Sequence, residues 1–305
     1  MTLIVTLPSP QAILATAGGK GFQLQRLMQC GLPVPPAFVI LADAYRAHIA
    51  QASVRMHLDS IRAAPQTEES VRLAQLRAAI NAAPLDDTLR ASVVTAVERL
   101  GDGSLAVRSS ATTEDGAWHS FAGQHDTVLG ARGADACCEA IRRCWASMWS
   151  ERAAAYRAQH GLSADAAAMA VVLQQCVSAD VAGVLFTLDP WRNNPHHLVI
   201  EAVFGLGETL VSGRVAPHRW VIDRTSRDVI EHTPALQPFE LVADASGGTR
   251  ERPIAPAERP RPCLTSAQIR QLADAGLAAE HAFGGPQDVE WAIADQRRRQ
   301  ADASS

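Results

Sequence analysis

The chain has 305 residues, of which 47% are hydrophobic, and this is enough to bury a large core in two or more subdomains. A formal net charge of -4 at pH 7 argues against a nucleic acid or an anionic membrane as partner. The N-terminus lacks the basic and apolar regions of a signal peptide, and no apolar run approaches the roughly 20 residues of a membrane helix.

The cations and cysteines are distributed unevenly. All but one of the 28 lysine and arginine residues are arginine, and the exception is Lys20. A lysine kept in such a sequence indicates a need for a compact ammonium group rather than a guanidinium fork. The six cysteines show neither CxxC pairing nor metal-ligand spacing with histidine, so we expect reduced thiols in a cytoplasmic protein.

The first hundred residues predict an α/β segment followed by helices. Residues 2–7 resemble a strand, and the glycines around Lys20 precede a helix that Gly31 ends. Glycines before a helix form an anion site in which a lysine meets phosphate as a point charge. After a second strand at 37–41, the spacing predicts three helices over 43–100, with His48 and His57 as solvated helix residues.

The stretch from Leu105 to Leu129 has an unusual composition. A short apolar run predicts a buried strand that leads to Arg108, followed by a cluster of serine and threonine hydroxyls. Small residues and Gly123 come next, and Thr127 begins another apolar run. A planar guanidinium, hydroxyl donors and accessible backbone N–H groups are the groups that bind phosphate oxygens. We therefore interpret the stretch as a phosphate-binding loop.

Further elements follow in order. Residues 134–159 predict one long amphipathic helix whose aromatic side chains, spaced for one face, belong to the core. Residues 168–177 predict a buried strand with a polar end. Strands at 183–190 and 198–202 and a hairpin across 224–227 come next. A loop over 233–263, a capped helix over 265–283 and a strand over 286–293 complete the pattern.

Several of these segments resemble one protein family. RSSATTEDGAWHSFAGQHDT, residues 108–127, resembles the signature loop of the nucleotide-binding domain of phosphoenolpyruvate synthases and pyruvate phosphate dikinases. Rifampicin phosphotransferases and the ATP-binding subunits of phenol-phosphorylating synthases are similar there. GGKG, CWASMWSERAAAYRAQHG, GVLFTLDP and PQDVEWA match further motifs of this family, so the resemblance covers roughly residues 11–293.

The resemblance implies an α/β fold of the ATP-grasp type, in which two subdomains clamp the nucleotide. Residues 1–100 would form an N-terminal α/β subdomain with a helical insertion, and 101–232 a central subdomain with the signature loop. Residues 233–263 would be a linker, and 264–305 a C-terminal helix and metal-site strand that is incomplete relative to the family.

The resemblance also implies roles for individual residues. Four residues would contact the phosphates: Lys20, Arg108, Gly123 and Thr127. Lys20 and Arg108 would also be catalytic. The nucleoside would contact Gln174 and the backbone of Val177, whereas Glu290 matches the glutamate that binds nucleotide-bound Mg²⁺. From their glycine-containing surroundings, Glu201 and Glu208 are candidates for the ribose or a metal, with ordinary loop acids as the alternative, and Glu208 is included among the nucleotide-binding residues.

Two positions depart from the family pattern. The metal-site strand is followed in the family by a partner strand ending in L-Q-x-R-P, and here 294–300 read ADQRRRQ. Three explanations stay open: the arginine run substitutes for that motif, a partner chain completes the site, or phosphate transfer is impaired. The family also has aspartate after the proline that corresponds to Pro217, whereas this chain has His218.

By resemblance, the chain is expected to be the ATP-binding subunit or domain of a dikinase-like phosphotransferase. It would bind Mg²⁺ and ATP and transfer a phosphoryl group to a histidine on a partner domain, with AMP as product. The histidine would then phosphorylate pyruvate, a phenol or another hydroxyl acceptor. The alternatives are a regulatory domain that binds ATP without turnover and a truncated remnant of a longer enzyme.

Overall fold

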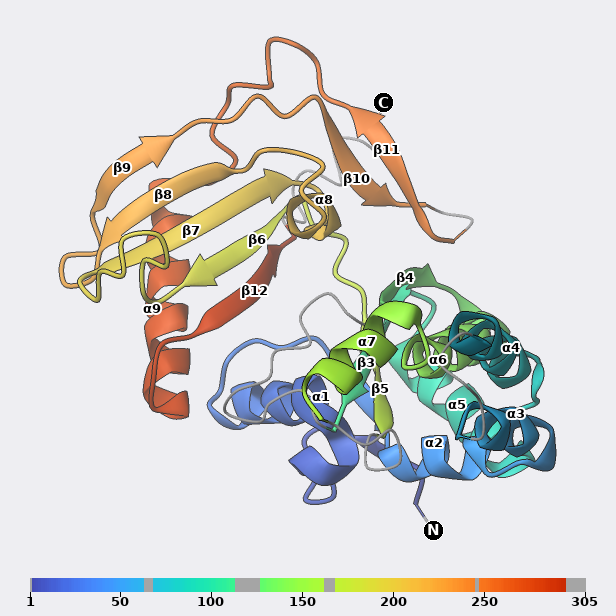
Figure 1. The fold of residues 1–305 in the computed structure, drawn as a ribbon. Helices are drawn as coiled ribbons and strands as arrows, with labels where there is room; N and C mark the ends of the chain where they lie inside the picture. The colour runs from blue at the N-terminus through green and yellow to red at the C-terminus, as the bar shows by residue number, and fades with distance from the viewer. Residues whose placement is uncertain (1, 63–67, 113–126, 162–167, 245–246, 295–305) are drawn as a thin grey trace. The chain divides into compact units, whose positions relative to one another are not determined.

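The computed structural model describes residues 2–62, 68–112, 127–161, 168–244 and 247–294. These residues belong to two compact units, of which the first ends at Cys176 and the second begins at Val177 (Figure 1). The boundaries expected after residues 100 and 232 fall inside these units. Both units combine helices with antiparallel sheet, which confirms the predicted mixed α/β class.

The first unit is built on a five-stranded antiparallel sheet with the strand order β1-β2-β5-β3-β4. Its strands are β1 (Ile4–Thr6), β2 (Ala37–Ile40), β3 (Leu105–Ala111), β4 (Thr127–Ala131) and β5 (Met169–Gln175). Strand β5 is almost wholly buried because β2 and β3 pair with its two edges and helices cover both of its faces. The three strands predicted at 2–7, 37–41 and 168–177 are thus confirmed.

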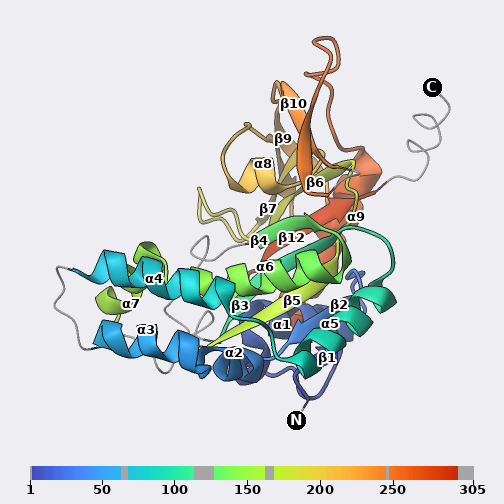
Figure 2. The same ribbon diagram turned by 90° about the vertical axis from the view of Figure 1, so that its right-hand side faces the viewer.

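Helices cover the two faces of this sheet unequally. Helix α1 (Leu14–Gln29) packs on one face with Val39 and Val172. The other face carries a group of helices that pack together around a larger core, and α6 runs along β3 and β5 (Figure 2). This group comprises α2 (Ala42–Ile49), α3 (Ala52–Arg62), α4 (Glu69–Ala82), α5 (Asp87–Leu100) and α6 (Gly133–Ser147).

The prediction of three helices over 43–100 was wrong, because the described residues there form four. The additional break lies at Ala50 and Gln51, where no proline or glycine interrupts the pattern. The Gln51 side-chain amide donates to the carbonyl oxygen of Pro84 and contacts His48 Nδ1, so tertiary contacts hold the break. His48 was also mispredicted as solvated: it is buried, and its Nε2 donates to the Ile80 carbonyl oxygen at 3.0 Å.

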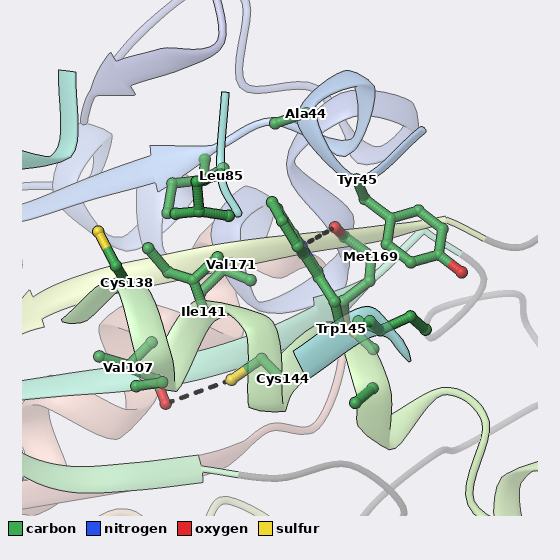
Figure 3. Close-up of a cluster of buried hydrophobic side chains, with 14 of the residues drawn as sticks. Ala44, Tyr45, Leu85, Val107, Cys138, Ile141, Cys144, Trp145, Met169 and Val171 are labelled. Atoms are coloured by element: carbon green, nitrogen blue, oxygen red, sulfur yellow. Dashed lines mark hydrogen bonds between the residues drawn. The ribbon is translucent and has the colours of Figure 1, made fainter. Parts of the chain in front are cut away.

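The prediction of one helix over 134–159 was likewise wrong. Helix α6 ends at Ser147, and α7 (Glu151–Gln159) begins after a short turn in which the Ser150 hydroxyl accepts from the Ala153 N–H. The assignment of the aromatic residues to the core is confirmed for Trp145 and Trp149. The Trp145 indole N–H donates to the Met169 carbonyl oxygen at 3.1 Å, which ties α6 to β5 inside this core (Figure 3).

The second unit contains a five-stranded antiparallel sheet with the order β12-β6-β7-β8-β9. Helix α9 (Ser266–Phe283) lies across one face of it and buries Ile269 and Ala273 (Figure 1). The short helix α8 (Glu208–Val211) follows β7. The strands of the sheet are β6 (Val181–Phe186), β7 (His197–Phe204), β8 (His218–Asp223), β9 (Val229–Thr233) and β12 (Asp288–Ile293).

Within the second unit, most predicted elements are confirmed and one is not. The hairpin across 224–227 joins β8 to β9, and Thr265 caps α9 with the predicted capping box to Gln268. Residues 233–263 are not a loop throughout, because β10 (Phe239–Ala243) and β11 (Thr249–Pro253) form a hairpin there. In the part of the chain that is described, no helix is long and apolar enough to cross a membrane.

Candidate phosphate and metal sites

The segment Ala17–Gly21, called the lysine loop below, interrupts helix α1. Gly18 has φ +68° and ψ 178°, so the helical path breaks there and resumes at the residues that carry Lys20. A Cβ atom on Gly18 would lie 2.1 Å from the carbonyl oxygen of Ser110. Only glycine fits this position, since the backbone conformation and the close approach of β3 both exclude a side chain.

The hydroxyl group of Ser110 joins the lysine loop to β3. It donates to the Ala17 carbonyl oxygen at 2.7 Å and accepts from the Gly21 N–H at 3.0 Å. Ser110 is completely buried. The lysine loop is therefore fixed against the same strand that carries the first arginine of the signature sequence.

Arg108 lies two residues before Ser110 on β3, so both side chains point to the α1 face of the sheet. Its neighbours in register are Thr127 on β4 and Val172 on β5. Thr127 is exposed, while Arg108 is half-buried. The structure thus brings together three of the predicted phosphate contacts: the loop of Lys20, Arg108 and Thr127. The fourth, Gly123, lies outside the described residues.

Gln174 shares the α1 face because it follows Val172 by two residues on β5. It pairs in register with Ala106 and Ala37, is 7% exposed, and its amide N–H donates to the Pro35 carbonyl oxygen at 3.4 Å. The glutamine is therefore held near the end of the central strand β5, next to the proline-rich segment. Its contact with a nucleoside stays a prediction.

The remaining predicted residues belong to the second unit. Val177 is its first residue, and the carbonyl oxygen of Val177 accepts from the Ala179 N–H at 2.8 Å. Glu208 is exposed in the first turn of α8. Neither the hydrogen bond of Val177 nor the exposure of Glu208 tests the roles toward ATP that are expected of these two residues.

Glu290 lies on β12, the edge strand of the second sheet, whose side chains alternate between exposed and half-buried. Asp288 lies on the same face of β12, and partial desolvation of its carboxyl by the surrounding protein, together with the charge of Glu290, raises the pKa of Asp288. Across the sheet, Glu290 pairs in register with Val184 on β6, Val184 pairs with Glu201 on β7, and Glu201 pairs with Arg219 on β8. Burial raises the pKa of Glu201, and the charge of Arg219 opposes this shift.

These carboxylates suit a hard dication. Asp288 and Glu290 repel each other, and carboxylate oxygens are the ligands that Mg²⁺ prefers in proteins. Among the described residues, no three His, Cys, Asp or Glu side chains gather closely enough to hold a metal ion. Mg²⁺ is commonly bound by one or two carboxylates together with substrate phosphates and water, and the donors on β12 fit that pattern.

The structure also accounts for His218, where the family pattern has aspartate. The imidazole is buried and stacks on Trp220 and His232, with centroid distances of 5.6 Å to each. Burial and the neighbouring His232 lower the pKa of His218 to about 4. This position is therefore part of a packed aromatic cluster.

The sequence analysis did not predict a charged pair in the second unit, formed by Asp189 and Arg219. Asp189 is fully buried, and its Oδ1 accepts from the backbone N–H groups of Trp191 and Arg192. Arg219 lies 3.7 Å from this carboxylate and stacks over the Trp191 ring at 3.8 Å. The available signal was the aspartate of the TLDP motif, which we had interpreted only as the end of a strand.

Comparison with known proteins places these observations in a family. Residues 14–300 match the model of the pyruvate phosphate dikinase AMP/ATP-binding domain, which agrees with the predicted ATP-grasp type of fold. The chain is 42% identical to the prodigiosin synthesizing transferase PigC of Serratia marcescens over 97% of its own length and 32% of the relative.

Two further relatives have other names. The chain is 40% identical to a rifampicin phosphotransferase of Streptomyces sviceus, with 92% of the chain and 33% of the relative covered. It is 36% identical to a probable phosphoenolpyruvate synthase of Methanocaldococcus jannaschii, with 90% of the chain and 24% of the relative covered. The chain thus spans a quarter to a third of the length of these relatives.

Proposed function

Because the chain belongs to the pyruvate phosphate dikinase AMP/ATP-binding domain family, we propose that it binds ATP with Mg²⁺ and supplies a phosphoryl group for transfer. The observation that carries this proposal is the arrangement on the α1 face, where one buried serine fixes the lysine loop beside Arg108 and Thr127. An ammonium on that loop, together with a guanidinium and a hydroxyl on neighbouring strands, would suit phosphate oxygens.

In this proposal, Lys20 and Arg108 neutralise the negative charge of the phosphates. Phosphoryl transfer needs little covalent chemistry from the protein, so positioning and electrostatic stabilisation contribute most of the rate enhancement. Both cations are held by rigid elements, since α1 and β3 are joined through Ser110. Thr127 adds a hydroxyl next to Arg108, and Gly123 would bring backbone N–H groups to the same phosphates.

The nucleoside and the metal would be bound by other residues. Gln174 and the Val177 backbone would contact the adenine, and Glu208 the ribose. Glu290 would hold Mg²⁺, which when bound screens the charge of the phosphates. Asp288 lies on the same face of β12, so its charge supports the metal site.

The phosphoryl group would pass to a histidine on another domain or subunit, with AMP as the nucleotide product. Release of AMP requires the second phosphate group to leave as well, to water or to inorganic phosphate. The name of one relative, rifampicin phosphotransferase, gives rifampicin as the molecule that this relative phosphorylates. For this chain, a hydroxyl-bearing acceptor is the class that the proposal supports.

The test is calorimetric titration of the purified chain with ATP and Mg²⁺. We expect Lys20→Ala and Arg108→Ala each to weaken binding by about 10- to 100-fold, because a hydrogen bond to a charged group contributes about 1.5–3 kcal/mol. The matched control is Arg55→Ala, which removes an arginine whose side chain is 58% exposed and pairs with Asp59. This control should bind ATP like the wild type.

The metal and the transfer step need separate measurements. Glu290→Gln should reduce the gain in ATP affinity that Mg²⁺ gives, with little effect on binding measured in a chelator. AMP formation would then be followed after addition of a histidine-bearing swivelling domain. ATP binding without AMP formation would favour the regulatory alternative, and a folded wild-type chain that does not bind ATP would refute the proposal.

A further inference from the structure

Two adjacent serines on β3 have different surroundings. Ser109 and Ser110 are both fully buried, but they point to opposite faces of the sheet. The Ser109 hydroxyl has no hydrogen-bond partner among the described residues, whereas the Ser110 hydroxyl both donates and accepts a hydrogen bond. Substitutions of the two serines can therefore separate the effect of removing a buried hydroxyl from the effect of removing the hydrogen bonds between Ser110 and the lysine loop.

The two partners of Ser110 lie on either side of Lys20. Ala17 precedes the lysine by three residues, and Gly21 follows it directly. Both partners are buried, so without the serine hydroxyl the Ala17 carbonyl and the Gly21 N–H would lose their hydrogen bonds away from water. Loss of a partner by a buried backbone group typically costs about 1–3 kcal/mol, and the loop would relax to recover hydrogen bonds elsewhere.

The contact is close as well as polar. The backbone of Gly18 approaches Ser110 so nearly that a Cβ atom there would lie 2.5 Å from the serine Oγ. The lysine loop thus rests on β3 through direct backbone contact. Arg108 is on the same strand and the same face, only two residues away. One short segment of β3 therefore holds the guanidinium and also anchors the loop that carries the ammonium.

We propose that Ser110 is a positioning residue that fixes Lys20 relative to Arg108, and that its hydroxyl does not itself bind phosphate. The inference rests on the proposed function, because it requires that Lys20 and Arg108 share a phosphate-bearing ligand. It assigns different roles to neighbouring hydroxyls of the signature sequence: Ser110 orders the site, whereas Thr127 faces outward beside Arg108.

The experiment compares the MgATP affinities of the wild type, Ser110→Ala and the matched control Ser109→Ala. We expect Ser110→Ala to weaken MgATP binding by about tenfold and Ser109→Ala to leave it within twofold of the wild type. The second arm introduces Ser110→Ala into Lys20→Ala. Because the residue that Ser110 positions is then absent, the serine substitution should change MgATP affinity by less than twofold.

Local exchange provides a readout that affinity alone does not. Hydrogen exchange of the Gly21 amide should be faster in Ser110→Ala than in Ser109→Ala, because this N–H donates to Ser110 Oγ. If Ser110→Ala does not fold, Ser110→Cys keeps a similar volume with a weaker donor and acceptor. That variant should show the same pattern with a smaller change, about threefold in MgATP affinity.

The outcomes separate the two proposals. If the wild type binds MgATP and Lys20→Ala weakens binding, but Ser110→Ala binds like Ser109→Ala, only the positioning role is overturned. An equal loss of affinity from Ser110→Ala with and without Lys20 would overturn it too, because the serine would then act on the ligand independently of the lysine. If the wild type does not bind MgATP, the proposed function fails and the inference fails with it.

Discussion

The packing of Gly18 against β3 can be tested by a single methyl group. In Gly18→Ala, the new Cβ would lie 2.1 Å from the Ser110 carbonyl oxygen, whereas ordinary contact begins near 3.4 Å. The lysine loop or β3 must therefore move by more than 1 Å. Overpacking of this kind costs roughly 2 kcal/mol, alanine at φ +68° and ψ 178° at least about 1 kcal/mol, and a weakened Ser110 hydrogen bond about 1 kcal/mol.

Together these effects predict that Gly18→Ala lowers the free energy of unfolding by about 4 kcal/mol, a large share of the roughly 5–15 kcal/mol of a typical protein. Gly31→Ala is the matched control, because Gly31 also has positive φ (+75°) but a Cβ there meets no atom of the described residues within 4 Å. It should cost only about 1 kcal/mol.

Urea unfolding followed by far-ultraviolet circular dichroism and by the fluorescence of the buried Trp145 and Trp149 would measure both values. The two variants share the change in side chain and the sign of φ, so the difference between them reports the contact with Ser110 together with the extended ψ of 178° at Gly18. If Gly18→Ala were as stable as Gly31→Ala, the close approach of the lysine loop to β3 would be refuted.

Two further predictions concern the second unit. The pKa of His218 is about 4 in the folded protein, below its usual 6.5, so its contribution to stability is complete above pH 6.5 and is lost as the pH falls toward 4. Unfolding in urea should show a loss of roughly 2 kcal/mol between pH 7 and pH 4.5, and an equally steep loss in His218→Gln would contradict the assignment. Thr265→Ala removes the capping box of α9 and should destabilise the second unit by about 1 kcal/mol in thermal unfolding. Ser266→Ala, one residue later in the same helix, is its control, and equal melting temperatures would show that the cap contributes nothing.

The sequence predicted best the elements whose boundaries have a local chemical cause. Helix α9 begins where Thr265 and Gln268 form a capping box, and both are visible as letters in the sequence. The hairpin between β8 and β9 likewise follows from two apolar runs separated by polar turn residues. In such cases the hydrogen bonds that end an element come from residues close to it in the chain.

The boundaries that were missed depend on contacts distant in sequence or on weak signals. The break between α2 and α3 is held by Gln51, whose amide bonds Pro84, and by the buried His48, which bonds Ile80. Neither residue at the break, Ala50 or Gln51, is a typical helix breaker. The break before α7 did have a local signal, since Ser150 is a favourable N-cap, but the continuous helical spacing around it was given more weight.

The candidate site shows the same division. Lys20 and Arg108 could be selected from composition and motif, but nothing in the sequence states that the lysine loop rests on β3. That contact joins residues about 90 positions apart. It also refines the interpretation of the signature sequence, in which the cluster of hydroxyls was a source of phosphate donors with no distinction between its members. The buried hydroxyl of Ser110 is instead occupied by backbone groups of the lysine loop.

Strand periodicity explains why neighbouring residues of one motif take different roles. On β3, Val107 and Ser109 point to the helical core, while Arg108 and Ser110 point to α1. A motif written as consecutive letters therefore describes two surfaces, and only one of them can meet a ligand on the α1 face. The same rule on β12 places Asp288 and Glu290 outward and Trp291 against the hydrophobic core to which α9 contributes. Functional roles in these segments should accordingly be assigned by alternate positions, and Ser109→Ala and Ser110→Ala test that rule directly.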